Sequence, residues 1–355
     1  MDVFSIINES HVKREYLYLN CEQIKIIPNY FCDNNIELQT LGLGYNEIEG
    51  LPYNFCNLIN LKNLALNNNI IITIPENLCN MINLEYINLS NNKIKIIPDS
   101  FCNLIKLKKI YLENNEIQKI PNNFSNFINL EYLNLGNNKI SEIPENFYNL
   151  PKLQEFQFHD NKIKYIPEFI NNLVNLKILN MSYNKINEIH DNFYNMINLE
   201  TIHFYNNEIT KISSSINNFK NLKILNFGHN KIKKFPDFTN NLVNLKNVNL
   251  CENYIDVFSK CVTDITNLEV LFIDSNLINE IPISIINLKK LREIDYGNNP
   301  IENINPIIQR FLNKITNKGG NIHNVYNDKQ NVHTSSIQNS VKNSIIRIFS
   351  YNNFK

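Results

Sequence analysis

Apolar residues recur at one fixed spacing along most of the chain. Within residues 130–144, apolar side chains fill the first, fourth, sixth, eleventh and fourteenth places, a proline fills the fifteenth, and most places between them are polar. The same pattern occupies 107–121 before it and 153–167 after it, except that the later stretch has phenylalanine at two of the apolar places. A fixed period of this length indicates repeated structural units that each pack on their neighbours.

Thirteen copies of this unit can be aligned, and only the first, over 14–37, is one place longer than the others. They begin at Arg14, Leu38, Leu61, Leu84, Leu107, Leu130, Leu153, Leu176, Leu199, Leu222, Leu245, Leu268 and Leu291. Alternating apolar and polar residues at the start of each copy predict a short strand with one buried face, and we expect the strands to stack in parallel. Proline at the fifteenth place, found in nine copies, favours turns or short 3₁₀ segments on the opposite side.

Asparagine occupies the ninth place in twelve of the thirteen copies, and Glu22 occupies it in the first. The twelve residues are Asn46, Asn69, Asn92, Asn115, Asn138, Asn161, Asn184, Asn207, Asn230, Asn253, Asn276 and Asn299. An amide can both donate to and accept from loop backbone that would otherwise be buried unpaired. We therefore interpret these residues as a structural ladder. The alternative is that Asn115 or Asn138 contacts a ligand.

The repeat over about residues 14–304 resembles that of the intracellular 23-residue leucine-rich repeat proteins, a class that includes Ras-suppressor-like scaffolds. The resemblance implies an α/β-type repeat solenoid: a leucine-rich repeat horseshoe with a parallel concave sheet and convex turns or 3₁₀ segments. It also implies protein binding on the concave sheet, and it brings no shared catalytic residues. The repeat departs from this pattern where His190, Ser213, Ser259 and Asn305 replace the proline, substitutions that could change the curvature locally.

Four parts are predicted along the chain: an N-terminal cap over 1–13, the solenoid over 14–304, a C-terminal cap helix over 305–318, and a basic tail over 319–355. The caps are expected because an open solenoid end leaves apolar surface unpaired. The tail begins at Gly319 and Gly320, which we interpret as a break in the chain.

The tail differs from the repeats in charge and pattern. Residues 305–355 carry seven basic residues and one acid, whereas the whole chain has 34 basic and 34 acidic residues. Apolar residues on one helical face predict a helix from about Ser336 to Phe349; they are Ile337, Val341, Ile345 and Ile348. The run at 326–333, Tyr-Asn-Asp-Lys-Gln-Asn-Val-His, resembles a tail found in leucine-rich repeat proteins of giant viruses that infect amoebae.

The positions of the cysteines indicate the cellular compartment in which the protein is expected. Cys32, Cys56, Cys79 and Cys102 hold one equivalent site in four successive repeats, which we interpret as small apolar residues packed in the convex wall; a metal or redox ladder is the alternative. The cysteines do not gather at the array ends, as disulfide caps would. No stretch approaches the roughly 18 apolar residues of a membrane span. We therefore expect an intracellular, cytoplasmic protein, in the host cytoplasm if it is viral.

Sequence motifs for catalysis are missing. We find no Gly-rich phosphate loop, no Cys-x-x-Cys pair and no His-Glu-x-x-His zinc motif, so we expect no enzyme activity, no cofactor and no metal. His159 and His203 would lie roughly 10 Å apart on the sheet, too far to share one ion. Charges at the second place of the repeats often alternate in sign, which favours a self-pairing rim over a nucleic-acid groove.

Information about a partner should lie where the exposed strand places, the third, fifth, seventh and eighth, depart from small polar residues. Within residues 153–230 these departures are Glu155, Gln157, His159, Asp160, Tyr183, His203, Tyr205 and His229. Tyrosine is enriched among residues that dominate interface energies. The alternative is that Tyr183 and Tyr205 only cover neighbouring strands.

Together these patterns predict a monomeric, non-enzymatic scaffold that binds a protein partner on the concave face. The alternative function is a regulatory adaptor whose basic C-terminal tail carries a separate docking activity. An enzyme with a nucleophile in the tail is a third class, but no cysteine follows Cys261.

Overall fold

The computed structural model describes residues 15–238, 241–317 and 319–323. The chain forms two compact units, unit 1 up to Leu199 and unit 2 from Glu200, and each is described by itself. The predicted N-terminal cap over 1–13 and the predicted helix between Ser336 and Phe349 lie outside the described residues.

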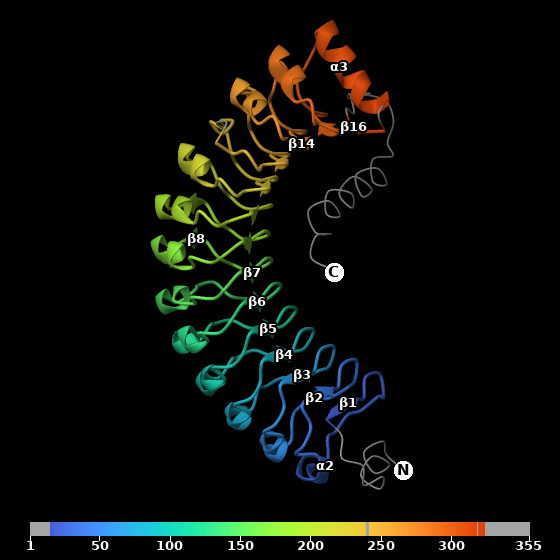
Figure 1. Ribbon diagram of the computed structural model, residues 1–355, viewed down its shortest axis with the longest axis vertical. Helices are drawn as coiled ribbons and strands as arrows, with labels where there is room; N and C mark the ends of the chain where they lie inside the picture. The colour runs from blue at the N-terminus through green and yellow to red at the C-terminus, as the bar shows by residue number, and fades with distance from the viewer. Residues whose placement is uncertain (1–14, 239–240, 318, 324–355) are drawn as a thin grey trace. The chain divides into compact units, whose positions relative to one another are not determined.

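Unit 1 contains eight strands that pair in parallel, each with the strand of the next repeat (Figure 1). The strands are β1 (Tyr16–Tyr18), β2 (Thr40–Gly42), β3 (Asn63–Ala65), β4 (Tyr86–Asn88), β5 (Lys109–Tyr111), β6 (Tyr132–Asn134), β7 (Glu155–Gln157) and β9 (Ile178–Asn180). The register joins identical places of successive repeats, as Leu64 with Ile87. A second, two-stranded sheet pairs β8 (Tyr165–Ile166) with β10 (Glu188–Ile189).

Short helices lie on the other side of each repeat of unit 1. They are α2 (Asn29–Asn34), η1 (Tyr53–Asn57), η2 (Glu76–Asn80), η3 (Asp99–Asn103), η4 (Asn122–Asn126), η5 (Glu145–Tyr148), η6 (Glu168–Asn172) and η7 (Asp191–Asn195). All but α2 are 3₁₀ helices. Proline precedes seven of the eight because its fixed φ suits the extended residue before a helix. Apolar residues of the helices, such as Phe124 and Phe147, are fully buried between them and the sheet.

Where proline is replaced, a side chain caps the helix instead. His190 precedes η7 with φ −64° and ψ 144°, nearly the angles of Pro144, and its Nδ1 accepts a hydrogen bond of 3.2 Å from the Asn192 amide. In unit 2, Ser213 and Ser259 do the same with their hydroxyl oxygens at 3.3 Å. At these three places the departures from proline therefore leave the local backbone unchanged, whereas Asn305 precedes the longer helix α3 (Pro306–Asn317).

Unit 2 continues the same architecture. Its strands are β11 (Thr201–His203), β12 (Ile224–Asn226), β13 (Asn247–Asn249), β14 (Val270–Phe272), β15 (Glu293–Asp295) and β16 (Asn321–His323), and its helices are η8 (Ser214–Asn218), η9 (Lys260–Asp264), η10 (Ile283–Asn287) and α3 (Pro306–Asn317). The thirteen predicted repeat strands are all present, each at the third to fifth places of its repeat, so the predicted repeat solenoid is confirmed.

Strand β16 was not anticipated from the sequence. It pairs in parallel with β15, so the range assigned to the tail begins with a strand of the sheet. Gly319 and Gly320 do not break the chain; they turn it from α3 into β16. Gly319 has φ +79°, and a Cβ on Gly320 would lie 2.2 Å from the Arg292 carbonyl oxygen, so only glycine fits there. Helix α3 packs on η10 and β16 with Ile308, Leu312 and Ile315 buried.

The ninth-place asparagines link neighbouring repeats through buried hydrogen bonds. Asn138 Oδ1 accepts from the Ile117 amide at 2.9 Å, and its Nδ2 donates to the Leu112 and Leu135 carbonyls at 3.0 and 3.1 Å. Two of these three partners belong to the preceding repeat. Each amide thus satisfies loop backbone that has left the strand ladder.

The eighth place has a conformation that the sequence did not reveal. In all thirteen repeats this residue has φ between 51° and 63°. Asparagine fills the place in six repeats because it tolerates the left-handed region better than most residues do. The bulkier exceptions, Tyr45, Tyr183 and Glu252, are therefore held in a costly backbone conformation.

Candidate partner-binding surface

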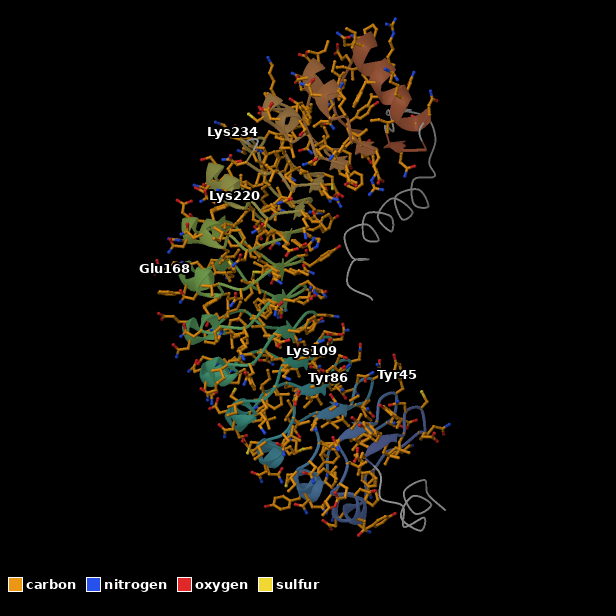
Figure 2. The ribbon with its side chains drawn as sticks, in the orientation of Figure 1. Tyr45, Tyr86, Lys109, Glu168, Lys220 and Lys234 are labelled. Atoms are coloured by element: carbon orange, nitrogen blue, oxygen red, sulfur yellow. The ribbon has the colours of Figure 1, made fainter. Side chains whose placement is uncertain are left out.

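The sheet face consists of the side chains at the third, fifth, seventh and eighth places of the repeats. In unit 1, Tyr45, Tyr86 and Lys109 lie on this side, whereas Glu168 lies on the side of the 3₁₀ helices (Figure 2). The fourth and sixth places, such as Leu64 and Leu66, point inward and are fully buried. Residues of the sheet face are therefore free to vary without loss of core packing.

Five of the sequence-predicted contact residues belong to unit 1. Gln157 is buried, and its side chain is taken up by neighbours: Nε2 donates to Glu155 Oε1 and Oε1 accepts from Asn180 Nδ2, both at 2.9 Å. Asp160 and Tyr183 are exposed and occupy the left-handed eighth place. The Gln157 side chain therefore holds Glu155 and Asn180 in place and leaves little surface for a partner protein.

His159 covers the glycine of the preceding repeat. A Cβ on Gly136 would lie 2.3 Å from His159 Cε1, so the ring fills the space that the missing side chain leaves. Burial lowers the pKa of His159, only partly opposed by the nearby Asp160, so the ring is neutral at pH 7. Its Nδ1 is buried without a hydrogen-bond partner among the described residues.

The other three predicted residues belong to unit 2. His203 is buried, Tyr205 is half-buried and His229 is exposed. The His229 ring meets the Tyr205 ring edge-on at 5.9 Å, and its Nε2 lies 3.6 Å from Glu252 Oε2. Tyr205 and His229 are thus brought together, while His203 has little surface for a partner.

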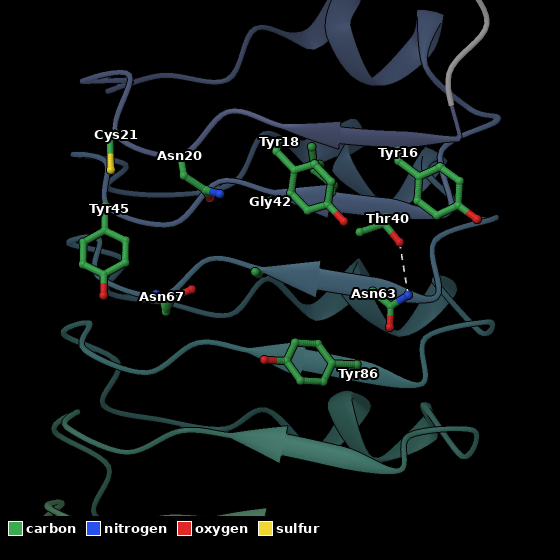
Figure 3. Close-up of a pocket in the computed structure, with 12 residues that line it drawn as sticks. Tyr16, Tyr18, Asn20, Cys21, Thr40, Gly42, Tyr45, Asn63, Asn67 and Tyr86 are labelled. Atoms are coloured by element: carbon green, nitrogen blue, oxygen red, sulfur yellow. Dashed lines mark hydrogen bonds between the residues drawn. The ribbon is translucent and has the colours of Figure 1, made fainter. Parts of the chain in front are cut away.

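A tyrosine-lined hollow on unit 1 was missed by the sequence reasoning. It lies over β1–β4, has a volume of about 750 Å³, and is lined by Tyr16, Tyr18, Tyr45 and Tyr86 (Figure 3). Tyr16, Tyr18 and Tyr45 are 60%, 65% and 61% exposed. We call this surface, Tyr16, Tyr18, Tyr45 and Tyr86 with their floor, the tyrosine hollow.

Small residues form the floor of the tyrosine hollow. Gly42 in β2 and Ala65 in β3 occupy the fifth place of their repeats. Gly42 pairs with the larger Tyr18 of β1 on one side and with Ala65 on the other. A Cβ on Gly42 would lie 2.8 Å from Tyr18 Cδ1, so glycine lets the ring lean over β2. A Cβ on Gly44 would meet Asn67 Oδ1 at 2.9 Å. The depression therefore follows from the two glycines of the second repeat and the small alanine of the third.

Tyrosine rings continue along the face beyond the hollow. Tyr111 lies 5.3 Å from Tyr86 and 4.6 Å from Tyr132, ring centre to ring centre, and the latter pair is stacked. Burial, with Tyr86 and Glu155 nearby, raises the pKa of Tyr111 to about 12. Burial also raises the pKa of Glu113, whose Oε2 is buried without a hydrogen-bond partner in the described chain. These stacked rings form a rigid aromatic surface.

The signal for the hollow was present in the sequence. Outside 153–230, tyrosines at the third, fifth and eighth places occur in repeats one, two and four to six, whereas the predicted contact residues all came from 153–230. Applied to every repeat, the same criterion would have selected Tyr16, Tyr18 and Tyr45. The exposure of each ring, in contrast, depends on neighbours and needed the structure.

Two family matches fall within the repeats. The family described as a leucine-rich repeat region matches residues 122–234, and the family described as leucine rich repeat matches residues 59–117. Over these residues the chain carries leucine-rich repeats, in agreement with its fold. No curated protein matches its sequence significantly.

Solved structures share the leucine-rich repeat fold of this chain. A leucine-rich repeat protein of Leptospira interrogans is 24% identical, with a TM-score of 0.75, over 92% of this chain and 88% of that one. An internalin of Listeria monocytogenes is 25% identical, with a TM-score of 0.78, over 90% and 89%. The plant peptide hormone receptor RGFR1, in complex with RGF2, is 26% identical, with a TM-score of 0.68, over 79% of this chain and 51% of that one.

Other candidate chemistry is sparse in the part of the chain that the structure describes. Its helices are all too short or too polar to cross a membrane, and no three metal-ligating side chains gather at one point there. All seven cysteines are free. Cys32 and Cys102 are buried, as apolar packing in the wall requires, whereas Cys56 and Cys79 are partly open to solvent.

Proposed function

We propose that this leucine-rich repeat protein is a non-enzymatic scaffold that binds a protein partner on the sheet face of unit 1, with the tyrosine hollow as the main contact. The observation that carries the proposal is the exposure of Tyr16, Tyr18 and Tyr45 around a floor of small residues. Tyrosine buries a large, rigid area at little entropic cost, which is why it dominates many interfaces. The hollow offers the concave shape that such contacts need.

The backbone under Tyr45 supports the same conclusion. Its φ of 56° costs about 1–2 kcal/mol for most residues, and asparagine fills this place in six other repeats. A large ring that is 61% exposed recovers only part of that cost through packing. A strained residue that is mostly exposed suggests a role in binding.

Substitution of the tyrosines tests the proposal. We expect a variant with Tyr16→Ala, Tyr18→Ala and Tyr45→Asn to lose proteins that the wild-type chain retains from cell lysate, with affinity for a purified partner falling at least tenfold. The matched control is Tyr53→Ala, because Tyr53 is 85% exposed but belongs to η1 on the other side. Retention that is equal in wild type and triple variant, or lost only with the control, would refute this assignment.

The other predicted contacts remain a proposal. In unit 1 we propose that contact extends to Glu155, His159, Asp160 and Tyr183, since the last two are exposed at the strained eighth place. In unit 2 we propose Tyr205 and His229. Gln157 and His203 are buried, so their substitution is expected to act through neighbouring side chains.

Compartment, class and origin are also proposals. We propose an intracellular protein of the Ras-suppressor-like class, supported by the 23-residue repeat and the seven free cysteines. An origin in a giant virus is supported only by the run at 326–333, outside the described residues. Separate docking by the basic tail is the second candidate function, favoured by its charge.

A further inference from the structure

A row of aliphatic side chains is open to solvent on one flank of unit 1, where each repeat returns from its helix to the sheet. The row occupies the penultimate place of the first six repeats, and we call it the flank stripe; it consists of Ile36, Ile59, Ile82, Ile105, Ile128 and Pro151. The five isoleucines are between 45% and 58% exposed, and the proline is exposed as well. Val174 and Ile197 continue the row in repeats seven and eight.

The backbone directs these side chains outward. From Ile59 onward the residue before each of them is buried, and Leu104, with φ −77° and ψ 60°, has the angles of an inverse γ-turn. In that turn the Ile105 amide donates to the Asn103 carbonyl oxygen at 2.9 Å. The chain therefore turns sharply around a buried residue and leaves the next side chain in solvent.

The fold does not require an apolar residue at the penultimate place. Lysine fills it in repeats nine and twelve, as Lys220 and Lys289, and Thr266 fills it in repeat eleven; all three are exposed. Isoleucine in five successive repeats therefore has a reason outside the packing of its own repeat. Contiguous exposed apolar patches of several hundred square ångströms mark interaction surfaces.

Hydrogen bonds hold the flank stripe in place. Asn83, the last residue of its repeat, donates through Nδ2 to the Ile59 carbonyl oxygen at 2.9 Å. Its Oδ1 accepts from Lys106 Nζ at 2.8 Å. Asn129 makes the same two bonds two repeats later. Polar groups beside the stripe are thus already paired, and a surface that is ordered in advance loses little entropy on binding.

Spacing and size make a second copy of this chain the best-fitting partner. Successive members of the stripe are one repeat apart, about 5 Å at the level of the sheet. A row with the same spacing can interdigitate with the stripe along its whole length, and a second copy carries such a row. The stripe exposes an apolar area on the order of 500 Å², to which the asparagines and charged residues beside it add. A stable interface buries about 800 Å² on each partner.

The charges beside the stripe favour an antiparallel arrangement. Three residues after each of four successive isoleucines the sign alternates, in the order Lys62, Glu85, Lys108 and Glu131. A two-fold axis midway between Ile82 and Ile105 would set Glu85 against Lys108 of the second copy, and Lys62 against its Glu131. Opposite charges then meet at all of these places, and such complementarity fixes the register of an interface.

We propose that two copies of this chain associate through their flank stripes in antiparallel orientation, with Ile82 and Ile105 of each copy at the centre. Such a dimer replaces the monomer expected from the sequence. The tyrosine hollow lies on the sheet face, so association leaves it open and gives the dimer two binding surfaces. The dimer does not depend on the binding role proposed for the hollow.

Sedimentation equilibrium of the full-length chain tests the association. We expect a species with twice the chain mass of 41.7 kDa at micromolar concentration. Ile82→Asp with Ile105→Asp should weaken the dimer about 100-fold, because the added charges meet at its centre. The matched control is Ile26→Asp with Ile96→Asp. These isoleucines are 77% and 73% exposed but lie on the connection that leaves the sheet, so this variant should still dimerise.

A second experiment uses the charges. Glu85→Lys and Lys108→Glu should each weaken the dimer at least tenfold, because lysine then faces lysine, or glutamate faces glutamate. Mixing the two variants should restore wild-type affinity, since the mixed pair has opposite charges at both places. Within one wild-type chain Lys108 Nζ lies 2.7 Å from Glu85 Oε2. Both variants lose this pair and mixing does not repair it, so a rescue reports a contact between chains.

The proposal is overturned if the wild-type chain is monomeric at about 100 µM, if the Ile82 and Ile105 double variant dimerises as well as its control, or if the mixture is no tighter than its components. A monomer whose double variant loses a different protein would assign the stripe to that protein instead. Tyr16→Ala with Tyr18→Ala and Tyr45→Asn should leave the dimer intact, so this proposal and that for the tyrosine hollow can fail separately.

Discussion

Replacement of Asn138 by alanine tests how the repeats hold together. Asn138 is buried and makes four side-chain hydrogen bonds, to the Ile117 amide and to the Leu112, Leu135 and Gly136 carbonyls. Alanine removes all four. The consequence differs among the partners because some of them have a second hydrogen bond.

The three carbonyls keep another donor after Asn138→Ala. Leu112 O still accepts from Asn115 Nδ2 at 3.1 Å, Leu135 O from Asn161 Nδ2 at 3.0 Å, and Gly136 O from the Asn114 amide at 3.0 Å. Only the Ile117 N–H loses its acceptor. An orphaned buried donor costs about 1–3 kcal/mol, and each lost bond with a retained partner costs about 0.5 kcal/mol. The free energy of unfolding should therefore fall by about 3 kcal/mol.

Urea unfolding followed by circular dichroism measures this loss, which corresponds to a midpoint lower by about 1 M. The matched control is Asn137→Gly: Asn137 is exposed, has φ 51°, and glycine also adopts that angle, so the cost should stay below about 1 kcal/mol. Hydrogen exchange should find the Ile117 amide protected in the control and open in Asn138→Ala. Equal midpoints for the two variants, or a protected Ile117 amide in both, would show that the Asn138 hydrogen bonds do not contribute this much to the free energy of unfolding.

Three further outcomes follow from the described contacts. Glu113→Gln should raise the melting temperature at pH 7 but not below about pH 4.5. A carboxyl whose folded pKa is raised stabilises the fold only while it is protonated, and this contribution is lost as pH rises. A gain in melting temperature that persists at low pH would contradict this cause. Tyr45→Asn alone should raise stability by about 1 kcal/mol in the same urea assay, since it relieves the left-handed tyrosine; a lower midpoint would show that the ring is needed for packing. A chain ending at residue 323 should melt near the wild-type temperature, whereas one ending at 318 should melt lower because it lacks β16, and equal melting would make β16 dispensable.

Much of the fold followed from the sequence because burial and backbone pairing repeat with the chain. Leu64 and Ile87 share a repeat place, and the structure pairs them. Strand β16 escaped notice because it lies outside the period and has a single apolar residue, Ile322. The left-handed eighth place also escaped notice, because residues as different as Tyr45 and Glu252 occupy it.

The candidate site was less predictable because exposure depends on neighbours that the pattern does not specify. Gln157 has the polar character of a contact residue, yet Asn180 and Glu155 take up its side chain. Tyr18 stands open because the adjacent strand offers only Gly42 at the same place. Residue type alone therefore selected the face but not the positions that matter on it.

The bonding of the ninth-place asparagines has a consequence for how such a chain can change length. Asn138 takes its partners from the same places of its own and the preceding repeat as Asn115 does in the repeat before. Duplication or loss of one whole repeat, wherever the cut falls, leaves every remaining amide with donors and acceptors of the same kind. An insertion or deletion of any other length would leave buried amides unpaired. Gene rearrangements that add or remove whole repeats are thus the ones this architecture tolerates, and the number of repeats can drift while the reach of the binding surface is adjusted.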